Sequence, residues 1–205
     1  LLSTSTKAEE GKTTVSSNVA VALARAGRRV VLVDSDIRKP QVHMIFSLDN
    51  SRGLSTILSG EYRAEEDLRD ILRQESAGGL AGYLQPTTVE NLRVLPSGPV
   101  VPNPLALLRS DTMEWLLREL RNEAELVILD SPPLLGVIDA AVLSSKADLT
   151  VVVLAEGEVR RSEAAQMKHA LNQVNTNIVG VVINKSKSRP EAYYYYYYRY
   201  RGYEG

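Results

Sequence analysis

Gly11, Lys12 and Thr13 have the clearest chemical potential in the sequence, because they follow a short apolar segment and open a helix-like pattern. A phosphate loop reads Gly, four residues, Gly-Lys-Ser/Thr, since backbone N–H groups must converge on phosphate oxygens at a helix N-terminus. Thr6 stands where the first glycine of that pattern belongs. The lysine suits the β and γ phosphates of ATP, and the hydroxyl suits Mg²⁺. The residues predicted to line this nucleotide site are Lys7, Ala8, Glu9, Glu10, Gly11, Lys12, Thr13 and Thr14.

Three carboxylates end hydrophobic strand-like runs. Asp34 and Asp36 follow the run 30–33, and Asp130 ends the run 126–130. The C-terminal ends of parallel strands share one edge, so these acids and the phosphate loop should meet in one crevice. Three unpaired acids would repel one another, and a divalent cation together with the loop lysine relieves that repulsion. Taken singly, each aspartate has a helix cap or a turn as its alternative.

Composition excludes several other chemistries. The chain has 205 residues, 24 Lys and Arg against 25 Asp and Glu, no cysteine, and only His43 and His169 as imidazoles. Disulfides, thiolate zinc sites and most two-histidine metal centres are therefore excluded, and both histidines are expected to be surface or packing residues. No run approaches the ~20 apolar residues of a membrane helix. The chain opens without Met inside a strand, which suggests a fragment of a longer polypeptide.

Helices and strands alternate along the chain. We expect helices over 11–26, 105–124, 139–145 and 162–174, and strands over 29–34, 126–130, 149–155 and 177–184. This order predicts an α/β fold with a doubly wound, mostly parallel sheet flanked by helices, as in a P-loop NTPase of the deviant Walker type. Residues 47–104 look less regular, with a charged helix over 64–74, and are expected to form an insertion that covers one end of the sheet.

The C-terminal end differs from the rest in composition. We expect one ATP-binding domain over 1–186 and a flexible tail over 187–205. Eight of the ten tyrosines lie in the tail, which is too concentrated for core packing: Tyr193, Tyr194, Tyr195, Tyr196, Tyr197, Tyr198, Tyr200 and Tyr203. Stacking on nucleic acid is an alternative, because Arg199 and Arg201 interleave with the aromatics, but the near-zero net charge argues against a nucleic-acid partner.

The residues 4–38, with Val-Leu-Val-Asp-Ser-Asp-Ile-Arg-Lys-Pro at 31–40, resemble the first two Walker elements of bacterial tyrosine kinases. Pro102-Asn103-Pro104, the segment 130–133 and the tyrosine cluster are similar to the rest of that family. The resemblance implies a tyrosine kinase that phosphorylates its own tyrosine cluster, with the tail of one chain entering the site of another. The related partition and cell-division ATPases lack the tail, and a non-kinase ATPase switch of that type is the alternative.

The resemblance also implies roles for single residues. Lys12 would hold the β and γ phosphates. Asp34 would face the tyrosine hydroxyl, Arg38 would order its loop, and Asn184 would contact adenine or cap its strand. An unperturbed aspartate with a pKa near 4, facing a tyrosine near 10, leaves about 8 kcal/mol for full proton transfer, so Asp34 is expected to orient the hydroxyl and accept its proton late. The implied ligands of Mg²⁺ are Thr13 and, through water, Asp36 and Asp130.

The phosphate loop departs from the family pattern. Ala8 and Glu9 stand where the family often has Pro and Gly, so a residue that tolerates positive φ is lost. Glu9 and Glu10 are expected to point outward, away from the phosphates. Lys7 stands where partition ATPases carry a lysine that reaches the nucleotide of a dimer partner, and an ordinary exposed loop lysine is the alternative.

Partners and location follow from the resemblance alone. It implies a homo-oligomer such as a ring, whose oligomerisation helix would lie upstream of residue 1. It also implies a transmembrane activator or polysaccharide co-polymerase, on the same chain or a separate one. The expected role is in capsule or exopolysaccharide synthesis, in the cytoplasm at the inner face of the membrane.

Overall fold

A computed structural model describes residues 1–60, 65–73 and 79–186. The strands and helices in chain order are β1 (Leu2–Ser5), α1 (Lys12–Arg25), β2 (Val30–Asp34), α2 (Val42–Phe46), α3 (Leu54–Leu58), α4 (Glu65–Arg73), η2 (Leu80–Gly82), β3 (Gln85–Pro86), β4 (Leu92–Leu95), α5 (Pro104–Arg109), α6 (Asp111–Glu123), β5 (Leu126–Asp130), α7 (Asp139–Lys146), β6 (Thr150–Ala155), α8 (Arg161–Gln173) and β7 (Ile178–Asn184). Within these residues the alternation of strand and helix confirms the predicted α/β class.

The described strands form one seven-stranded sheet in the order β3-β4-β2-β5-β1-β6-β7. Every neighbouring pair is parallel except β3 with β4 at one edge. The register pairs Asp34 of β2 with Asp130 of β5, so two of the predicted acids lie at the same level on adjacent strands. Parallel pairing thus brings the strand ends that carry the acids to one edge, as expected.

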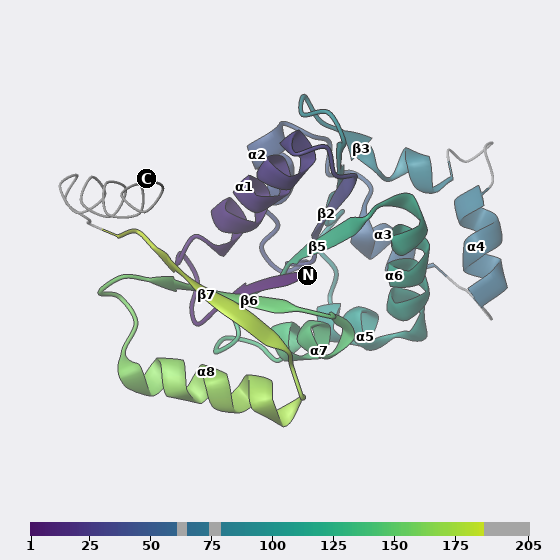
Figure 1. Ribbon diagram of the computed structural model, residues 1–205. Coiled ribbons are helices and arrows are strands. Elements are labelled where there is room, and N and C mark those ends of the chain that lie inside the picture. The colour runs from purple at the N-terminus through teal and green to yellow at the C-terminus, as the bar shows by residue number, and fades with distance from the viewer. Residues whose placement is uncertain (61–64, 74–78, 187–205) are drawn as a thin grey trace, which may run out of the picture.

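Helices cover both faces of the sheet (Figure 1). On one face α1 contributes Ala20 and Ala24, which pack with Leu32 of β2 and Ile128 of β5. On the other face Leu116 of α6 packs in one cluster with Val31 and Val33 of β2. On that face α8 also packs against β6. A strand that is covered on both faces is typically apolar at every position, which explains the continuous run in β2; β1 is an exception, because it is buried yet carries Ser3, Thr4 and Ser5.

Two predicted elements were wrong. The single helix expected over 105–124 is two helices, because Ser110 is extended (φ −65°, ψ 156°) and its Oγ accepts the N–H of Met113, which caps α6. A serine that caps a new helix interrupts the preceding one. The expected insertion over 47–104 also contributes to the sheet, since β4 pairs with β2. A strand of four residues is too short for its periodicity to be seen in the sequence.

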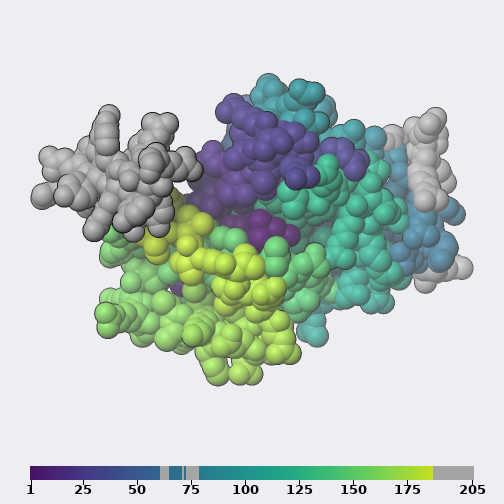
Figure 2. All heavy atoms as spheres, viewed as in Figure 1, coloured from purple at the N-terminus to yellow at the C-terminus, as the bar shows by residue number. Residues whose placement is uncertain are grey.

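The charged helix expected over 64–74 is present as α4, although Ala64 and Gln74 lie outside the described residues. The last strand, β7, lies at the surface between the α1 and α8 parts of the molecule (Figure 2). Its side chains Val179, Val181 and Ile183 are 52 to 54% exposed. The predicted tail over 187–205 lies outside the described residues, so the division at residue 186 stays a prediction.

Candidate functional site

The phosphate loop connects β1 to α1 and ends in a helix start that lacks a side-chain cap. Gly11, the N-cap residue, has φ 85°, in the left-handed region that glycine adopts without steric strain. A Cβ at Gly11 would also come within 2.0 Å of Nδ2 of Asn184. The start of α1, which has no side-chain cap, is therefore suited to face an anion, and a larger residue at position 11 would be strained at this φ and would have to displace the side chain of Asn184.

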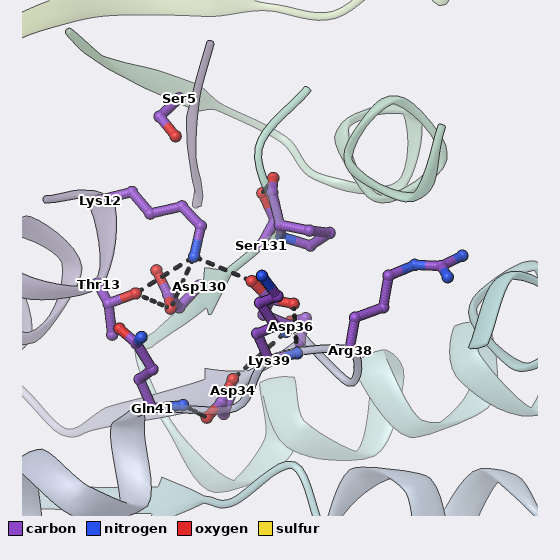
Figure 3. A network of polar contacts seen from close by, with 12 residues as sticks. Ser5, Lys12, Thr13, Asp34, Asp36, Arg38, Lys39, Gln41, Asp130 and Ser131 are labelled. Atoms are coloured by element: carbon purple, nitrogen blue, oxygen red, sulfur yellow. Dashed lines mark hydrogen bonds and ion pairs between the residues drawn. The ribbon is translucent and has the colours of Figure 1, made fainter. Parts of the chain in front are cut away.

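Lys12 lies at the centre of a polar cluster formed by three elements (Figure 3). Its Nζ is 3.2 Å from Oδ2 of Asp36, 3.6 Å from Oδ2 of Asp130 and 3.2 Å from Oγ1 of Thr13. The side chains of Lys12, Asp36 and Asp130 are 11%, 7% and 1% exposed. At such burial the two carboxylates need the ammonium charge, because uncompensated buried charges are strongly destabilising.

Asp130 is tied to α1 by two hydroxyls. Oγ1 of Thr13 donates to Oδ2 of Asp130 at 2.8 Å, and Oγ of Ser16 donates to Oδ1 at 3.0 Å. Burial raises the pKa of Asp130, while Lys12 and these two hydroxyls oppose the rise. Ser16 is not among the site residues predicted from the sequence. The available signal was its spacing, since Thr13 and Ser16 are three residues apart and share one face of α1.

The oxygens at this cluster suit Mg²⁺. Among the described residues no group of three or more His, Cys, Asp or Glu side chains could hold a metal ion. Mg²⁺, however, is usually bound in proteins by one or two carboxylates together with substrate phosphates and water. Thr13, Asp36 and Asp130 supply a hydroxyl and two carboxylates within one cluster, so the residues fit the expected ion.

Asp34 is fully buried and turned away from that cluster. Its Oδ2 accepts the N–H groups of Gln41 at 3.0 Å and Val42 at 2.9 Å, at the start of α2, and its Oδ1 accepts only a longer bond of 3.3 Å from the N–H of Asp36. Burial and the neighbouring Asp130 raise the pKa of Asp34 to about 7. The expectation of an ordinary pKa was wrong, because it ignored the cost of desolvating the carboxylate.

Arg38 makes a two-pronged ion pair with Asp139, the first residue of α7. The Nε to Oδ2 distance is 2.6 Å and the Nη2 to Oδ1 distance is 3.2 Å. The carboxylate of Asp139 is 1% exposed and raises the pKa of Arg38. The pair ties the loop after β2 to the start of α7, and the ordering role expected of Arg38 stays a prediction. Asp139 was missed, because its partner lies 101 residues away in sequence.

The two glutamates of the phosphate loop take different positions. Glu9 is exposed and has φ 67°, so this position does require the left-handed conformation. Glu10 is 2% exposed, which corrects the expectation that it points outward. Its carboxylate accepts hydrogen bonds from Thr6, the residue at the missing-glycine position. Hydrogen bonding inside the loop makes burial of this acid possible.

Lys7 and Asn184 contact the protein itself. Lys7 Nζ is 2.6 Å from Oε1 of Glu163 at the start of α8, so the loop lysine is paired within its own chain. Nδ2 of Asn184, the last residue of β7, donates to the backbone oxygen of Glu10 at 2.9 Å. The end of β7 therefore rests on the phosphate loop.

A cavity of about 480 Å³ opens beside the cluster, which is within the range of small-molecule sites. Its lining includes most of the predicted phosphate-loop residues and four residues of the loop after β2, namely Asp36, Arg38, Lys39 and Gln41. Lys7, Glu10, Asp34, Asp130 and Asn184 do not line it. The full lining is Ala8, Glu9, Gly11, Lys12, Thr13, Thr14, Asp36, Arg38, Lys39, Gln41, Pro132, Pro133, Gly136 and Val137.

The fold and this site define a P-loop ATPase. The family described as AAA domain matches residues 4–185, and the chain belongs to it. Within that fold the chain belongs to the bacterial tyrosine kinases, as its relatives show. It is 36% identical over 178 residues to tyrosine-protein kinase YwqD of Bacillus subtilis (strain 168), covering 87% of this chain and 68% of that protein. It is 37% identical over 183 residues to CpsD of Streptococcus pneumoniae serotype 4, covering 89% and 74%.

Solved structures agree with this assignment. The kinase domain of Escherichia coli tyrosine kinase ETK superposes with a TM-score of 0.80 at 30% identity, covering 92% of this chain and 68% of that one. The chimerical protein CapA2B2 superposes at 0.79 with 32% identity, covering 91% and 76%. The cell-division ATPase MinD of Pyrococcus furiosus, at 22% identity and 0.68, covering 93% and 76%, shows the shared fold alone.

Proposed function

We propose that this kinase uses Mg-ATP to phosphorylate the tyrosine cluster of another copy of itself, at Tyr193 to Tyr198, Tyr200 and Tyr203. The observation that carries the nucleotide part is the cluster of Lys12 with Asp36 and Asp130 beside a cavity lined by the phosphate loop. Transfer of a phosphoryl group depends mainly on positioning and on electrostatic stabilisation, and this cluster supplies both.

In this proposal Lys12 leaves its carboxylate partners and binds the β and γ phosphates. Thr13 and, through water, Asp36 and Asp130 would hold Mg²⁺, which would neutralise charge on the phosphate oxygens. Glu9 and Thr14 line the phosphate end of the cavity with Ala8 and Gly11. Asn184 lies beside the loop and not in the cavity lining, and one N–H of its Nδ2 is bonded to Glu10, so a contact with adenine would use its Oδ1 or its second N–H.

We retain Asp34 as the proposed acceptor of the tyrosine proton, with one condition from its geometry. Oδ1 is the less engaged oxygen, but the carboxylate is buried, so the start of α2 must shift for it to meet a substrate. Its pKa of about 7 reduces the gap to a tyrosine near 10 to ~3 units, or about 4 kcal/mol. Late proton transfer during phosphoryl transfer remains the favoured order.

Phosphorylation in trans is proposed because the tyrosine cluster stands at the C-terminal end of the sequence, after the domain that carries the site, and could enter the site of a neighbouring copy. Asn184 at the tail's root contacts the chain's own phosphate loop, so reach alone does not separate trans from cis transfer. Each phosphate adds ~1.5 to 2 negative charges, and modified tails would repel one another within a ring-like homo-oligomer. This repulsion would favour dissociation of the assembly.

Mass spectrometry of the purified full chain after incubation with Mg-ATP tests the proposal. Phosphate on the tyrosine cluster is expected, and Lys12→Met should abolish it. Mixing Lys12→Met protein with an active variant that lacks residues 187–205 should label the Lys12→Met tail. An active partner that leaves this tail unlabelled would count against transfer in trans.

We further propose a role in capsule or exopolysaccharide synthesis, with a transmembrane activator, at the cytoplasmic face of the membrane. The matched chimerical protein CapA2B2 supports a second component beside the kinase. In the described part of the chain no helix is long and apolar enough to cross a bilayer. Co-purification from membranes with and without the candidate activator tests the association. No nucleic acid is proposed as a partner.

The alternative is an ATPase switch of the partition type, and it stays in consideration because Lys7 stands where partition ATPases carry a lysine. Lys7 pairs with Glu163 of its own chain, and a switch would require that lysine to be released toward a partner. Nucleotide binding and hydrolysis without any phosphotyrosine would favour this alternative over the kinase proposal.

A further inference from the structure

We propose that Glu10 is a positioning residue whose carboxylate braces the phosphate loop through Thr6, in place of the glycine that the loop lacks. The inference rests on the proposed nucleotide site but is independent of which group receives the phosphate. It assigns a purpose to an acid that the loop pattern does not require.

The contacts join the two ends of the loop. Oε2 of Glu10 accepts the backbone N–H of Thr6 at 2.8 Å, and Oε1 accepts its hydroxyl. Thr6 is fully buried and Glu10 is 2% exposed. Hydrogen bonds to a charged group in a buried setting are among the stronger ones, so this closure fixes the loop's span.

The backbone of Glu10 is held as well. Its carbonyl oxygen accepts Nδ2 of Asn184, and the next residue is Gly11, whose left-handed φ begins α1. Side chain and main chain thus connect this residue to the end of β1 and to the end of β7. A loop fixed from both sides presents its amides to a phosphate without further ordering, which favours binding.

Charge explains why this acid is tolerated beside a phosphate site. Glu9 is exposed and lines the cavity, where its charge repels phosphates. Glu10 does not line the cavity, and both of its oxygens are occupied within the loop. Adjacent glutamates should therefore affect nucleotide affinity in opposite directions.

Nucleotide titrations of the full chain test this inference, with ATP and Mg²⁺ as the probe and with thermal unfolding recorded for every variant. Glu10→Ala should weaken ATP binding roughly 10- to 100-fold, because a buried charged pair of hydrogen bonds is lost. Glu10→Gln, which keeps one acceptor oxygen, should recover part of the loss. Glu9→Gln should instead raise the affinity for ATP, and Glu66→Gln at an exposed position of α4 is the matched control that should leave it unchanged.

Variants of Thr6 form the second half of the test, and they keep the inference testable if the Glu10 variants fail to fold. Thr6→Val removes the hydroxyl and keeps the N–H, so it should weaken ATP binding by a smaller factor, and Thr6→Ser should restore it. Thr6→Val should add nothing in a Glu10→Ala background. In steady-state assays, KM for ATP should rise in these variants while kcat changes by less than about threefold, because the braced loop contributes mainly to binding ATP and little to the chemical step.

Tighter ATP binding by Glu10→Ala or Glu10→Gln would overturn the inference, because it would show that the carboxylate of Glu10 only repels the phosphates. Equal affinities for parent and Glu10→Ala would overturn it as well, while leaving phosphorylation by the parent intact. A parent chain that binds no ATP would overturn both this inference and the proposed function.

Discussion

Nε of Arg38 lies 2.6 Å from Oδ2 of Asp139, and this ion pair joins the loop after β2 to the start of α7. Both segments border the cavity beside the phosphate loop, through Arg38 itself and through Gly136 and Val137 just before the helix. The pair thereby sets the position of the loop that carries Asp36. Breaking this pair should therefore reduce activity, although neither residue belongs to the phosphate loop.

Asp139→Ala should lower kcat/KM about tenfold and lower the free energy of unfolding by about 1 to 3 kcal/mol. This loss lies between the ~3 to 5 kcal/mol of a broken buried pair and the ~0 to 1 kcal/mol of an exposed one, because Asp139 is buried while the guanidinium of Arg38 is partly exposed to solvent. Arg38→Lys should lower kcat/KM by nearly as much as Asp139→Ala does, because an ammonium cannot reproduce the two-pronged contact. Kinase assays and denaturant unfolding of both single variants and of the double variant measure the coupling. Fully additive losses would contradict the pairing.

Asp34→Asn should remove a pH dependence of stability in protein free of nucleotide and Mg²⁺. The folded-state pKa of about 7 exceeds the usual value near 4, so between these pH values the folded chain keeps a proton that the unfolded chain releases. The free energy of unfolding therefore falls as the pH rises through this window, by at most about 4 kcal/mol.

The asparagine variant should accordingly match the parent only at or below about pH 4, where Asp34 stays protonated even in the unfolded chain, and should exceed its melting temperature by a margin that grows up to about pH 7 and is fully present at about pH 8. Thermal unfolding across this range checks the expectation, with Asp70→Asn at an exposed position of α4 as the control. Parallel pH profiles for the parent and Asp34→Asn would show that Asp34 titrates normally.

Glu9→Gly should stabilise the loop and tighten ATP binding. A non-glycine residue at φ 67° carries about 1 kcal/mol of backbone strain, part of which is offset by the greater freedom of glycine in the unfolded chain. Removing an acid from the cavity lining should increase affinity by a few-fold on electrostatic grounds. Comparison with Glu9→Gln, which removes charge but keeps the strain, separates the two effects. A lower melting temperature for the glycine variant would contradict the strain argument.

Gly11→Ala should abolish ATP binding, whereas Gly27→Ala should not. Both glycines have φ near 85°, but a Cβ at Gly11 would meet Asn184 within 2.0 Å, and a Cβ at Gly27 would meet nothing within 4 Å. Equal backbone strain in the two variants leaves the steric clash as the difference. Adding Asn184→Ala to Gly11→Ala should recover part of the stability loss in unfolding experiments. Equal destabilisation by the two glycine substitutions would argue against the clash.

The sequence by itself determined the α/β class, the location of the phosphate loop and the acids at the strand ends. These depend on local signals: apolar runs of strand length, helical spacing after Gly11, and aspartates directly after β2 and β5. Parallel pairing then places strand ends at one edge regardless of sequence detail, so Asp36 and Asp130 meet at Lys12 as expected.

Only the tertiary structure decided how each side chain is used. Glu10 turns inward because Thr6 offers it two donors, Asp34 is buried because the amides of α2 hold it, and Asp139 reaches Arg38 from 101 residues away. Such choices depend on which donors lie within about 3 Å once distant segments pack together. Sequence spacing does not encode those distances, because they arise only when the sheet brings its strand ends and loops to one edge.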